Sequence, residues 1–174
     1  MNKKIEISLI LGTGRENSNS QKVSNFVFNE LKNFGFKVNF IKLRDWLGKP
    51  WTGGMDDSKR KIVSKVLKKS KGFIIVSPEY NHSFPGELKL FLDEFYEEFN
   101  HKPVGICGVS VGKLGGARMV ESLRLVLIEL MMIPLRNAVY FSNVNNFENE
   151  KENYKELLKN LFEELKFYME KLSN

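Results

Sequence analysis

The chain has 174 residues, 42% hydrophobic and 28% charged, which is the size and composition of one soluble globular domain and excludes a disordered chain. Its one cysteine, Cys107, excludes an internal disulfide framework, and no apolar run is as long as a membrane span, so we expect a single domain over residues 1–174, in the cytoplasm and without a membrane partner. The net charge of +6 comes largely from lysines spread through the amphipathic segments, and no aromatic residues interleave with their densest cluster, Lys68, Lys69 and Lys71, which favours a solvated surface over a nucleic-acid partner.

The first half of the chain alternates between strand and helix patterns. Residues 5–11 predict a strand, and the helix pattern that follows ends at Gly35. Residues 36–43 predict a second strand, and a short helix comes after a loop rich in Trp, Gly and Pro. Residues 73–76 form the continuous apolar run of a strand buried on both faces. The apolar positions of the two helices are Val23, Phe26, Val27, Leu31 and Phe34, then Ile62, Val63, Val66 and Leu67.

The second half continues the alternation. A helix opens at Pro85 with apolar positions extending to Phe99, and residues 104–109 predict a fourth strand. A helix from about Gly116 to Met132, a short strand at 138–141 and an amphipathic helix at 154–172 complete the series. Strands and helices in alternation predict an α/β fold, a flavodoxin-like three-layer sandwich with a five-stranded parallel sheet of order 2-1-3-4-5 and helices on both faces.

Ligands of such sheets bind beyond the carboxyl ends of the strands, which directs attention to the loops after Leu11, Val76 and Val109. The first loop opens with Gly-Thr-Gly and leads into a helix that Ser18 or Asn19 is placed to cap, so the positive end of the helix faces the loop. An arginine adds positive charge to this end of the helix, and several hydroxyls add hydrogen-bond donors. Together they match a phosphate dianion without a metal: Thr13, Arg15, Ser18 and Ser20.

Two other phosphate motifs are excluded. A dinucleotide fingerprint needs a third glycine where the chain has Asn17, and a Walker loop needs Ser or Thr after Gly-Lys, where the chain has Pro50 and Leu114. A polar turn that only caps the helix is the alternative to phosphate binding. The position at the sheet edge, with an arginine among hydroxyls, favours the phosphate.

The third loop carries a hydrolase-like nucleophile pattern around Ser110. The triad of that fold needs a histidine after the serine, but His82 and His101 both precede it, so an esterase is disfavoured. The chain also lacks His and Cys clusters at metal-ligand spacing, and we expect no metal.

The second loop, residues 77–89, holds two prolines around a Tyr-Asn-His run that offers a flat face and polar edges, which suits a planar heterocycle. At this loop the sequence resembles the NADPH-dependent FMN reductases of the flavodoxin-like superfamily, a family that includes azo-, quinone and chromate reductases. The resemblance covers roughly residues 5–141. It is carried by Pro78-Glu79-Tyr80-Asn81-His82-Ser83-Phe84-Pro85-Gly86-Glu87-Leu88-Lys89, by Gly12-Thr13-Gly14-Arg15 with Ser18, and by Gly115-Gly116-Ala117-Arg118 with Glu121, Leu123 and Arg124. The chain departs from the family at Thr13, often a serine, and after Asp93, where relatives usually have a tryptophan.

The resemblance implies a bound FMN. The residues implied for its phosphate are Thr13, Arg15, Ser18 and Ser20; those implied for its ring and ribityl chain are Pro78, Glu79, Tyr80, Asn81, His82 and Ser83; those implied for the other edge of the ring are Ser110, Gly112, Gly115 and Gly116. Backbone amides near Asn81, His82 and Gly112 are candidates to stabilise charge on the ring, with an exposed loop position as the alternative for His82. No side chain is predicted to be catalytic.

The implied function is an oxidoreductase in which NADPH or NADH passes a hydride to FMN, and a small acceptor (flavin, quinone, azo compound or metal oxyanion) then takes the electrons in ping-pong order. The alternatives are a flavodoxin-type electron carrier and an FMN-binding sensor without turnover. Carriers of that type are typically acidic, whereas this chain is basic.

The resemblance also implies a homodimer or homotetramer. Candidate contact residues, with a purely core role as the alternative, are Phe95, Tyr96, Phe99, Leu127, Leu130 and Met131. The two tryptophans of residues 45–54 either line the acceptor pocket or, as we favour, cover the sheet edge.

Overall fold

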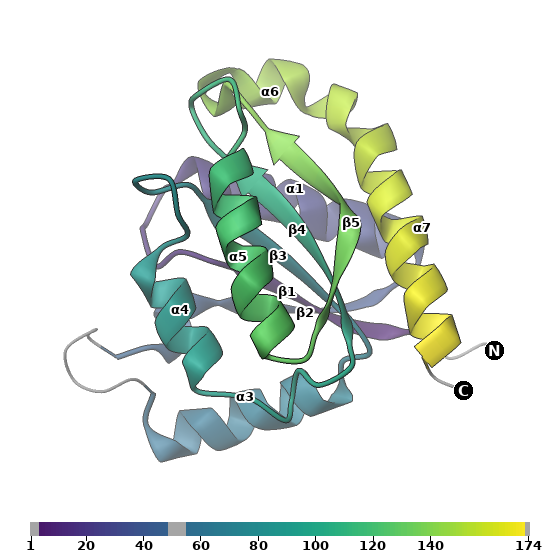
Figure 1. Cartoon of the computed structure of the whole chain (residues 1–174). Coiled ribbons are helices and arrows are strands. Elements are labelled where there is room, and N and C mark those ends of the chain that lie inside the picture. The colour runs from purple at the N-terminus through teal and green to yellow at the C-terminus, as the bar shows by residue number, and fades with distance from the viewer. Residues whose placement is uncertain (1–3, 49–54, 173–174) are drawn as a thin grey trace.

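A computed structural model describes residues 4–48 and 55–172 and shows one sheet between two layers of helices (Figure 1). The five strands are all parallel, in the order β2-β1-β3-β4-β5, which confirms the predicted flavodoxin-like topology. Residues 49–54, with most of the loop that holds Trp51, lie outside the described residues, so the expectation for that loop stays a prediction.

The strands begin and end close to the predicted positions, with one exception at the end of the sheet. They are β1 (Glu6–Leu11), β2 (Lys37–Lys42), β3 (Phe73–Pro78), β4 (Pro103–Val109) and β5 (Ile133–Phe141). The two central strands β3 and β4 are buried at every residue, as their continuous apolar runs predict.

The helices include short ones that the periodicity does not reveal. They are α1 (Asn19–Phe34), α2 (Leu43–Trp46), α3 (Asp57–Lys69), α4 (Gly86–Asp93), α5 (Ala117–Glu129), α6 (Phe147–Glu150) and α7 (Lys155–Leu172), with 3-10 turns η2 (Val144–Asn146) and η3 (Lys151–Tyr154) around α6. The apolar faces of α1 and α7 pack on one side of the sheet, and those of α3, α4 and α5 pack on the other.

The ends of α1 follow directly from the sequence. The Ser18 side chain accepts a hydrogen bond from the backbone N–H of Gln21, so Ser18 rather than Asn19 is the N-cap. Gly35 ends the helix with a φ of 110°, a left-handed conformation that costs glycine little. The helix therefore presents its capped, positive end at the carboxyl edge of the sheet.

Two predicted boundaries are wrong. The helix that opens at Pro85 ends at Asp93 instead of continuing to Phe99, yet Phe95 and Phe99 stay buried because the turns that follow fold back onto the same core. The last strand begins at Ile133 instead of Ala138.

An irregularity in the pairing of β5 accounts for the second error. The register with β4 shifts between Val104 and Ile106, where β5 holds extra residues in the manner of a β-bulge. The carboxylate of Glu164 on α7 accepts the N–H groups of Arg136 and Asn137 at 3.0 and 3.1 Å. The guanidinium of Arg124 on α5 donates to the carbonyls of Leu135 and Arg136 at 2.5 and 3.0 Å. Side chains from two helices thus replace the missing ladder bonds.

Burial in the core decides the role of Cys107 and of most of the candidate contact residues. Cys107 is fully buried in β4, and burial raises the pKa of its thiol, so it behaves as a small hydrophobic residue. Four of the six candidate contact residues belong to the chain's own core: Phe95, Phe99, Leu127 and Leu130. No helix in the described ranges combines the length and hydropathy that crossing a membrane requires.

Candidate functional site

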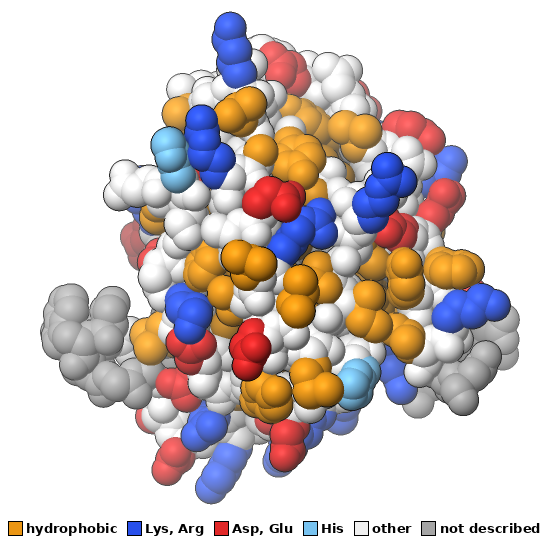
Figure 2. Space-filling model, viewed as in Figure 1, with side chains coloured by type: hydrophobic (Ala, Val, Ile, Leu, Met, Phe, Trp, Pro, Cys, Tyr) orange, Lys and Arg blue, Asp and Glu red, His pale blue; other side chains and the backbone are white. Residues whose placement is uncertain are grey.

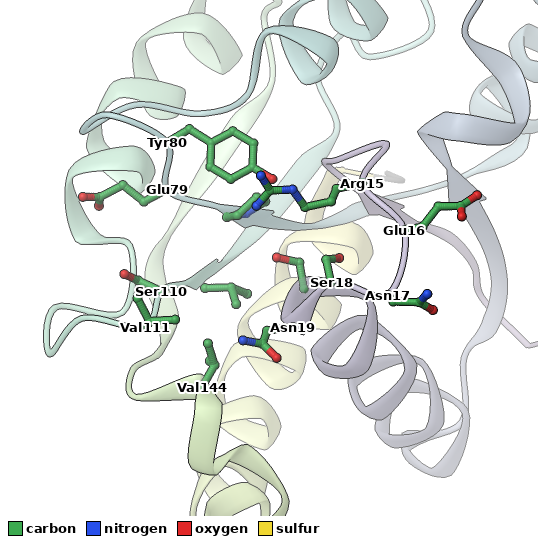
Figure 3. A pocket seen from close by; sticks show the side chains of 13 residues that line it. Arg15, Glu16, Asn17, Ser18, Asn19, Glu79, Tyr80, Ser110, Val111 and Val144 are labelled. Atoms are coloured by element: carbon green, nitrogen blue, oxygen red, sulfur yellow. The ribbon is translucent and has the colours of Figure 1, made fainter.

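A pocket of about 460 Å³ lies at the carboxyl ends of the strands (Figure 3). All three predicted loops contribute to it. The loop after β1 supplies residues 15–20, the loop after β3 supplies 78–80, and the loop after β4 supplies 109–111, with Val144 of η2 closing one side. The volume lies within the range of sites for small organic ligands, about 300–1,000 Å³.

The loop after β1 leaves a row of backbone donors free. Among the described residues, the N–H groups of residues 16–20 donate to no protein acceptor. Ser18 accepts from Gln21 and keeps its own hydroxyl hydrogen for a ligand, and the Ser20 hydroxyl has no partner among the described side chains. Free amides and hydroxyls at the start of a 16-residue helix form an anion-binding end.

The Arg15 side chain crosses from this loop toward the loop after β3. Its guanidinium carbon lies 5.4 Å from the centre of the Tyr80 ring, a cation–π contact (Figure 3). Ser18 lies on the far side of the pocket from the Tyr80 ring, while the Glu16 and Asn17 side chains project away from it. The pocket thus has hydroxyls and free amides at one end and an aromatic face at the other, with the Arg15 guanidinium on that face.

Thr13 differs from the other predicted phosphate ligands because its side chain is fully buried and fully used. Its Oγ1 donates to Glu87 Oε1 at 3.0 Å and accepts from the N–H of Arg15 at 3.2 Å. The Tyr80 hydroxyl lies 3.3 Å away. A hydroxyl has one hydrogen, so Thr13 has none to offer a ligand while it donates to Glu87.

Arg44 of α2 holds the same loop from outside. Its Nη2 donates to the carbonyl of Arg15 at 2.7 Å and to Gln21 Oε1 at 3.2 Å, and its Nη1 lies 3.5 Å from Glu16 Oε1. The sequence reasoning missed this residue, since α2 is a single helical turn in a stretch without periodic signal.

The loop after β3 is a tight turn built on left-handed residues. Tyr80 and Ser83 exchange two backbone hydrogen bonds of 2.9 and 3.1 Å, and the two residues between them, Asn81 and His82, have φ values of 50° and 66°. Positive φ at both central positions defines a type I′ turn. Among the described residues, the N–H groups of Asn81 and His82 have no acceptor, and both side chains are exposed. The turn therefore offers two free amides beyond the Tyr80 ring.

Two residues of this loop bond toward α5. The Glu79 carboxylate lies 3.4 Å from both the backbone N of Met119 and Nη1 of Arg118, so it stabilises the first turn of that helix. Ser83 Oγ lies 3.2 Å from Ser122 Oγ, which itself donates to the carbonyl of Met119. The Glu79 side chain still borders the pocket, while Ser83 does not.

The loop after β4 is packed against β5 by its glycines. Gly115 and Gly116 have φ values of 58° and 85°, and a Cβ on Gly115 would lie 2.7 Å from the backbone of Tyr140. The N–H of Gly112 donates to Ser110 Oγ at 3.0 Å, so this predicted ring donor is engaged within the loop. Ser110 borders the pocket, whereas Gly112 and Gly115 do not.

Seven of the fourteen predicted binding residues border the pocket: Arg15, Ser18, Ser20, Pro78, Glu79, Tyr80 and Ser110. Asn81 and His82 lie next to it on the exposed turn, and the remaining five, Thr13, Ser83, Gly112, Gly115 and Gly116, lie outside its lining. Sequence reasoning missed Val144, because the 3-10 turn after β5 has no periodic signal. It also missed the roles of Arg44 and Glu87, since contacts between distant side chains leave no local pattern.

The residues present fit a phosphorylated planar ligand such as FMN. The free amides, hydroxyls and arginine at the start of α1 suit a phosphate, and the Tyr80 turn with its two unpaired amides suits the edge of a heterocycle. The described residues contain no group of three or more His, Cys, Asp or Glu placed to hold a metal ion. The arrangement thus offers unpaired hydrogen-bond donors from two loops to an anionic ring system.

Comparison with known proteins also indicates an FMN-binding protein. Residues 5–146 match the family model described as NADPH-dependent FMN reductase. The chain is 24% identical over 167 residues to the NADPH azoreductase of Bacillus sp. (strain OY1-2), covering 95% of this chain and 93% of that protein. It is 30% identical over 129 residues to a 2-hydroxy-1,4-benzoquinone reductase of Burkholderia sp, covering 69% and 68%.

Among solved structures, the fold is similar to the X-ray structure of an oxidoreductase from Corynebacterium diphtheriae. The TM-score is 0.80 at 15% identity, over 97% of this chain and 99% of that one. At this identity the likeness shows the shared fold alone.

Proposed function

This chain belongs to the NADPH-dependent FMN reductase family, and from that premise we propose that it takes electrons from NAD(P)H and reduces small aromatic acceptors at the pocket described above. One observation carries the assignment to this pocket: the capped start of α1, with its unpaired amides, faces the Tyr80 turn across a single cavity. A phosphate end and an aromatic end in one cavity are what a mononucleotide requires.

The phosphate end is proposed to consist of Arg15, Ser18, Ser20 and the free amides of residues 16–20. Arg15 supplies the positive charge, and the two serines supply hydroxyl hydrogens. Thr13 is assigned a supporting role, because its hydrogen goes to Glu87. These groups hold the dianion without a metal ion.

The ring end is proposed to consist of residues 78–83 and Ser110. The type I′ turn fixes the amides of Asn81 and His82 before any ligand arrives, so they can receive negative charge with little reorganisation. Tyr80 limits the cavity on one side. Gly112 and Gly115 are proposed to shape the loop that borders the ring, as their packing against Ser110 and β5 indicates.

Bound FMN supplies the redox chemistry, by accepting a hydride from the nicotinamide and passing electrons on to the acceptor. The residues of this chain would bind and orient it, and a nicotinamide or an acceptor would approach it past the exposed residues Asn81 and His82. No side chain needs to transfer a proton for this, so we assign no catalytic acid or base.

The acceptor is proposed to be a quinone or an azo compound. Both relatives described above are named for acceptors of this class, and the pocket is lined by apolar and polar atoms without a cluster of charge. Free flavin and metal oxyanions are the other acceptors to compare.

A steady-state assay tests this proposal. FMN-loaded protein is given NADPH or NADH with a benzoquinone, an azo dye, free FMN or chromate, each over a range of concentrations. The proposal predicts turnover with at least the quinone or the dye, and parallel double-reciprocal lines. Turnover with none of them, by a protein that does bind FMN, would favour an electron carrier or a sensor.

The chain is further proposed to act in the cytoplasm as a single domain that forms a homodimer or a homotetramer. The face formed by α4 and α5 carries exposed apolar side chains among charged ones (Figure 2). On and beside α5 they are Leu125 (72% exposed), Ile128 (60%), Met131 (42%) and, after α4, Tyr96 (48%). Light scattering of the wild type and of the Ile128→Glu variant tests this, and a wild-type monomer at micromolar concentration would contradict it.

A further inference from the structure

Glu87 lies in the first turn of α4 and reaches back to the loop between β1 and α1, which we call the phosphate loop after its proposed ligand. Its Oε1 accepts the hydroxyl hydrogen of Thr13 at 3.0 Å and the N–H of Gly14 at 3.2 Å. The residue is only partly exposed, and it does not border the pocket itself. It therefore contacts the loop at Thr13 and Gly14, outside the lining of the pocket.

The hydrogen bonds of Thr13 have a fixed direction. Since its one hydrogen goes to Glu87 and the Arg15 N–H occupies one lone pair, the Tyr80 hydroxyl must be the donor in the 3.3 Å contact with Oγ1. A chain of donation thus runs from Tyr80 through Thr13 to Glu87. All three hydrogen-bonding positions of the buried hydroxyl are filled.

Two oppositely charged side chains hold the loop. Glu87 binds the donors of Thr13 and Gly14, and Arg44 binds the carbonyl of Arg15. Between them, these side chains fix three consecutive residues directly before the free amides of residues 16–20. A loop held in this way loses little freedom when an anion binds, which favours tight binding.

We propose that Glu87 is a positioning residue for the phosphate loop and thereby determines how strongly the site prefers a phosphorylated flavin over an unphosphorylated one. The inference rests on the proposed function. Glu87 acts through Thr13 and Gly14 and needs only its acceptor oxygen, so glutamine replaces it and leucine does not.

Flavin binding tests the inference without turnover. Dissociation constants of FMN and of riboflavin, which lacks the phosphate, are measured by flavin fluorescence for the wild type, Glu87→Gln and Glu87→Leu. Glu97→Leu, an exposed glutamate beyond the far end of α4, is the matched control. For Glu87→Leu we expect FMN binding to weaken about tenfold or more, because Thr13 and Gly14 lose their acceptor. Riboflavin binding should change less than about twofold, and Glu87→Gln should stay within about threefold of the wild type for both flavins.

A second variant keeps the test valid if Glu87→Leu folds poorly. Thr13→Val removes the hydroxyl through which Glu87 acts, so its own FMN and riboflavin dissociation constants test the same link. We expect Thr13→Val to weaken FMN more than riboflavin.

Each result decides the inference. Equal losses for FMN and riboflavin in Glu87→Leu, or unchanged FMN binding, would overturn it. A wild type that binds neither flavin would instead overturn the proposed function, and the two failures are therefore distinguishable.

Discussion

Among the residues that the structure describes, Arg15 is the one cation that lines the pocket, and it contacts two neighbours. The guanidinium rests on the Tyr80 ring, and Arg44 holds the Arg15 carbonyl from behind. In the proposed site, Arg15 contributes positive charge to FMN binding, whereas the serines and backbone amides contribute directed hydrogen bonds. The contribution of the charge can be measured with Arg15 variants.

Arg15→Ala is expected to weaken FMN binding by about ten- to a hundredfold, the cost of one charge-assisted hydrogen bond of about 1.5–3 kcal/mol. Arg15→Lys should recover part of the loss, since lysine keeps the charge but not the planar contact with Tyr80. Isothermal titration at low and high salt checks both values. An Arg15→Ala protein with unchanged affinity would remove Arg15 from the site.

His82 occupies a left-handed position in which a side chain costs energy. Because its backbone N–H rather than its imidazole is proposed to serve the ligand, His82→Gly should retain FMN binding within a few-fold and should not lower the thermal midpoint. His82→Val should destabilise the turn by about 1–2 kcal/mol, since β-branched residues resist positive φ. Loss of FMN binding in a folded His82→Gly protein would show that the imidazole itself is needed.

At the scale of single elements, β5 depends on two side chains from other helices. Glu164 satisfies two N–H groups of the irregular segment, and Arg124 satisfies two carbonyls. Glu164→Ala is expected to lower the free energy of unfolding by about 1–3 kcal/mol, because those N–H groups lose their charged acceptor. Urea unfolding measures it, with the exposed Glu163→Ala as the control. Equal stability of the two variants would contradict this role.

The edge of the sheet carries a pH-dependent contact between β1 and β2. Hydrogen bonds from Lys37 and Asn39, at 2.8 and 3.0 Å, hold the pKa of Glu6 below its ordinary value of 4.5. A lowered pKa contributes stability above pH 4.5 that is lost as the pH falls through the lowered value. Glu6→Gln should therefore be less stable than the wild type at pH 7, by less than about 1 kcal/mol for such a surface pair, and equal to it near pH 2–3. A difference that grows toward low pH would contradict this.

The elements that the sequence predicts well are those with local causes. The continuous apolar runs locate β3 and β4, and Ser18 and Gly35 locate both ends of α1. The wrong boundaries have causes that are not local. The spacing of Phe95 and Phe99 predicts a longer helix, but α4 ends at Asp93 and the turns after it bury both side chains through tertiary packing. The bulge in β5 depends on Glu164 and Arg124, and the support of the phosphate loop depends on Arg44 and Glu87. No periodic pattern records such contacts.

At the scale of the whole molecule, the parallel sheet is what brings the site together. The loops after β1, β3 and β4 lie far apart in the sequence, and only the strand order β2-β1-β3-β4-β5 places them side by side at one edge. The fold thus explains why the loop before α1, the Tyr80 turn and the loop after β4 share one cavity. Family membership adds the redox chemistry that this cavity is suited to hold.

The most direct test of the central claim is the reductive half-reaction. Protein loaded with one equivalent of FMN is mixed with NADPH or NADH without oxygen, and the flavin absorbance near 450 nm is followed by stopped flow. We expect rapid loss of the absorbance with at least one nicotinamide, and its return when a quinone is added. Protein that binds FMN but keeps its absorbance with both nicotinamides would not be an NAD(P)H-dependent reductase.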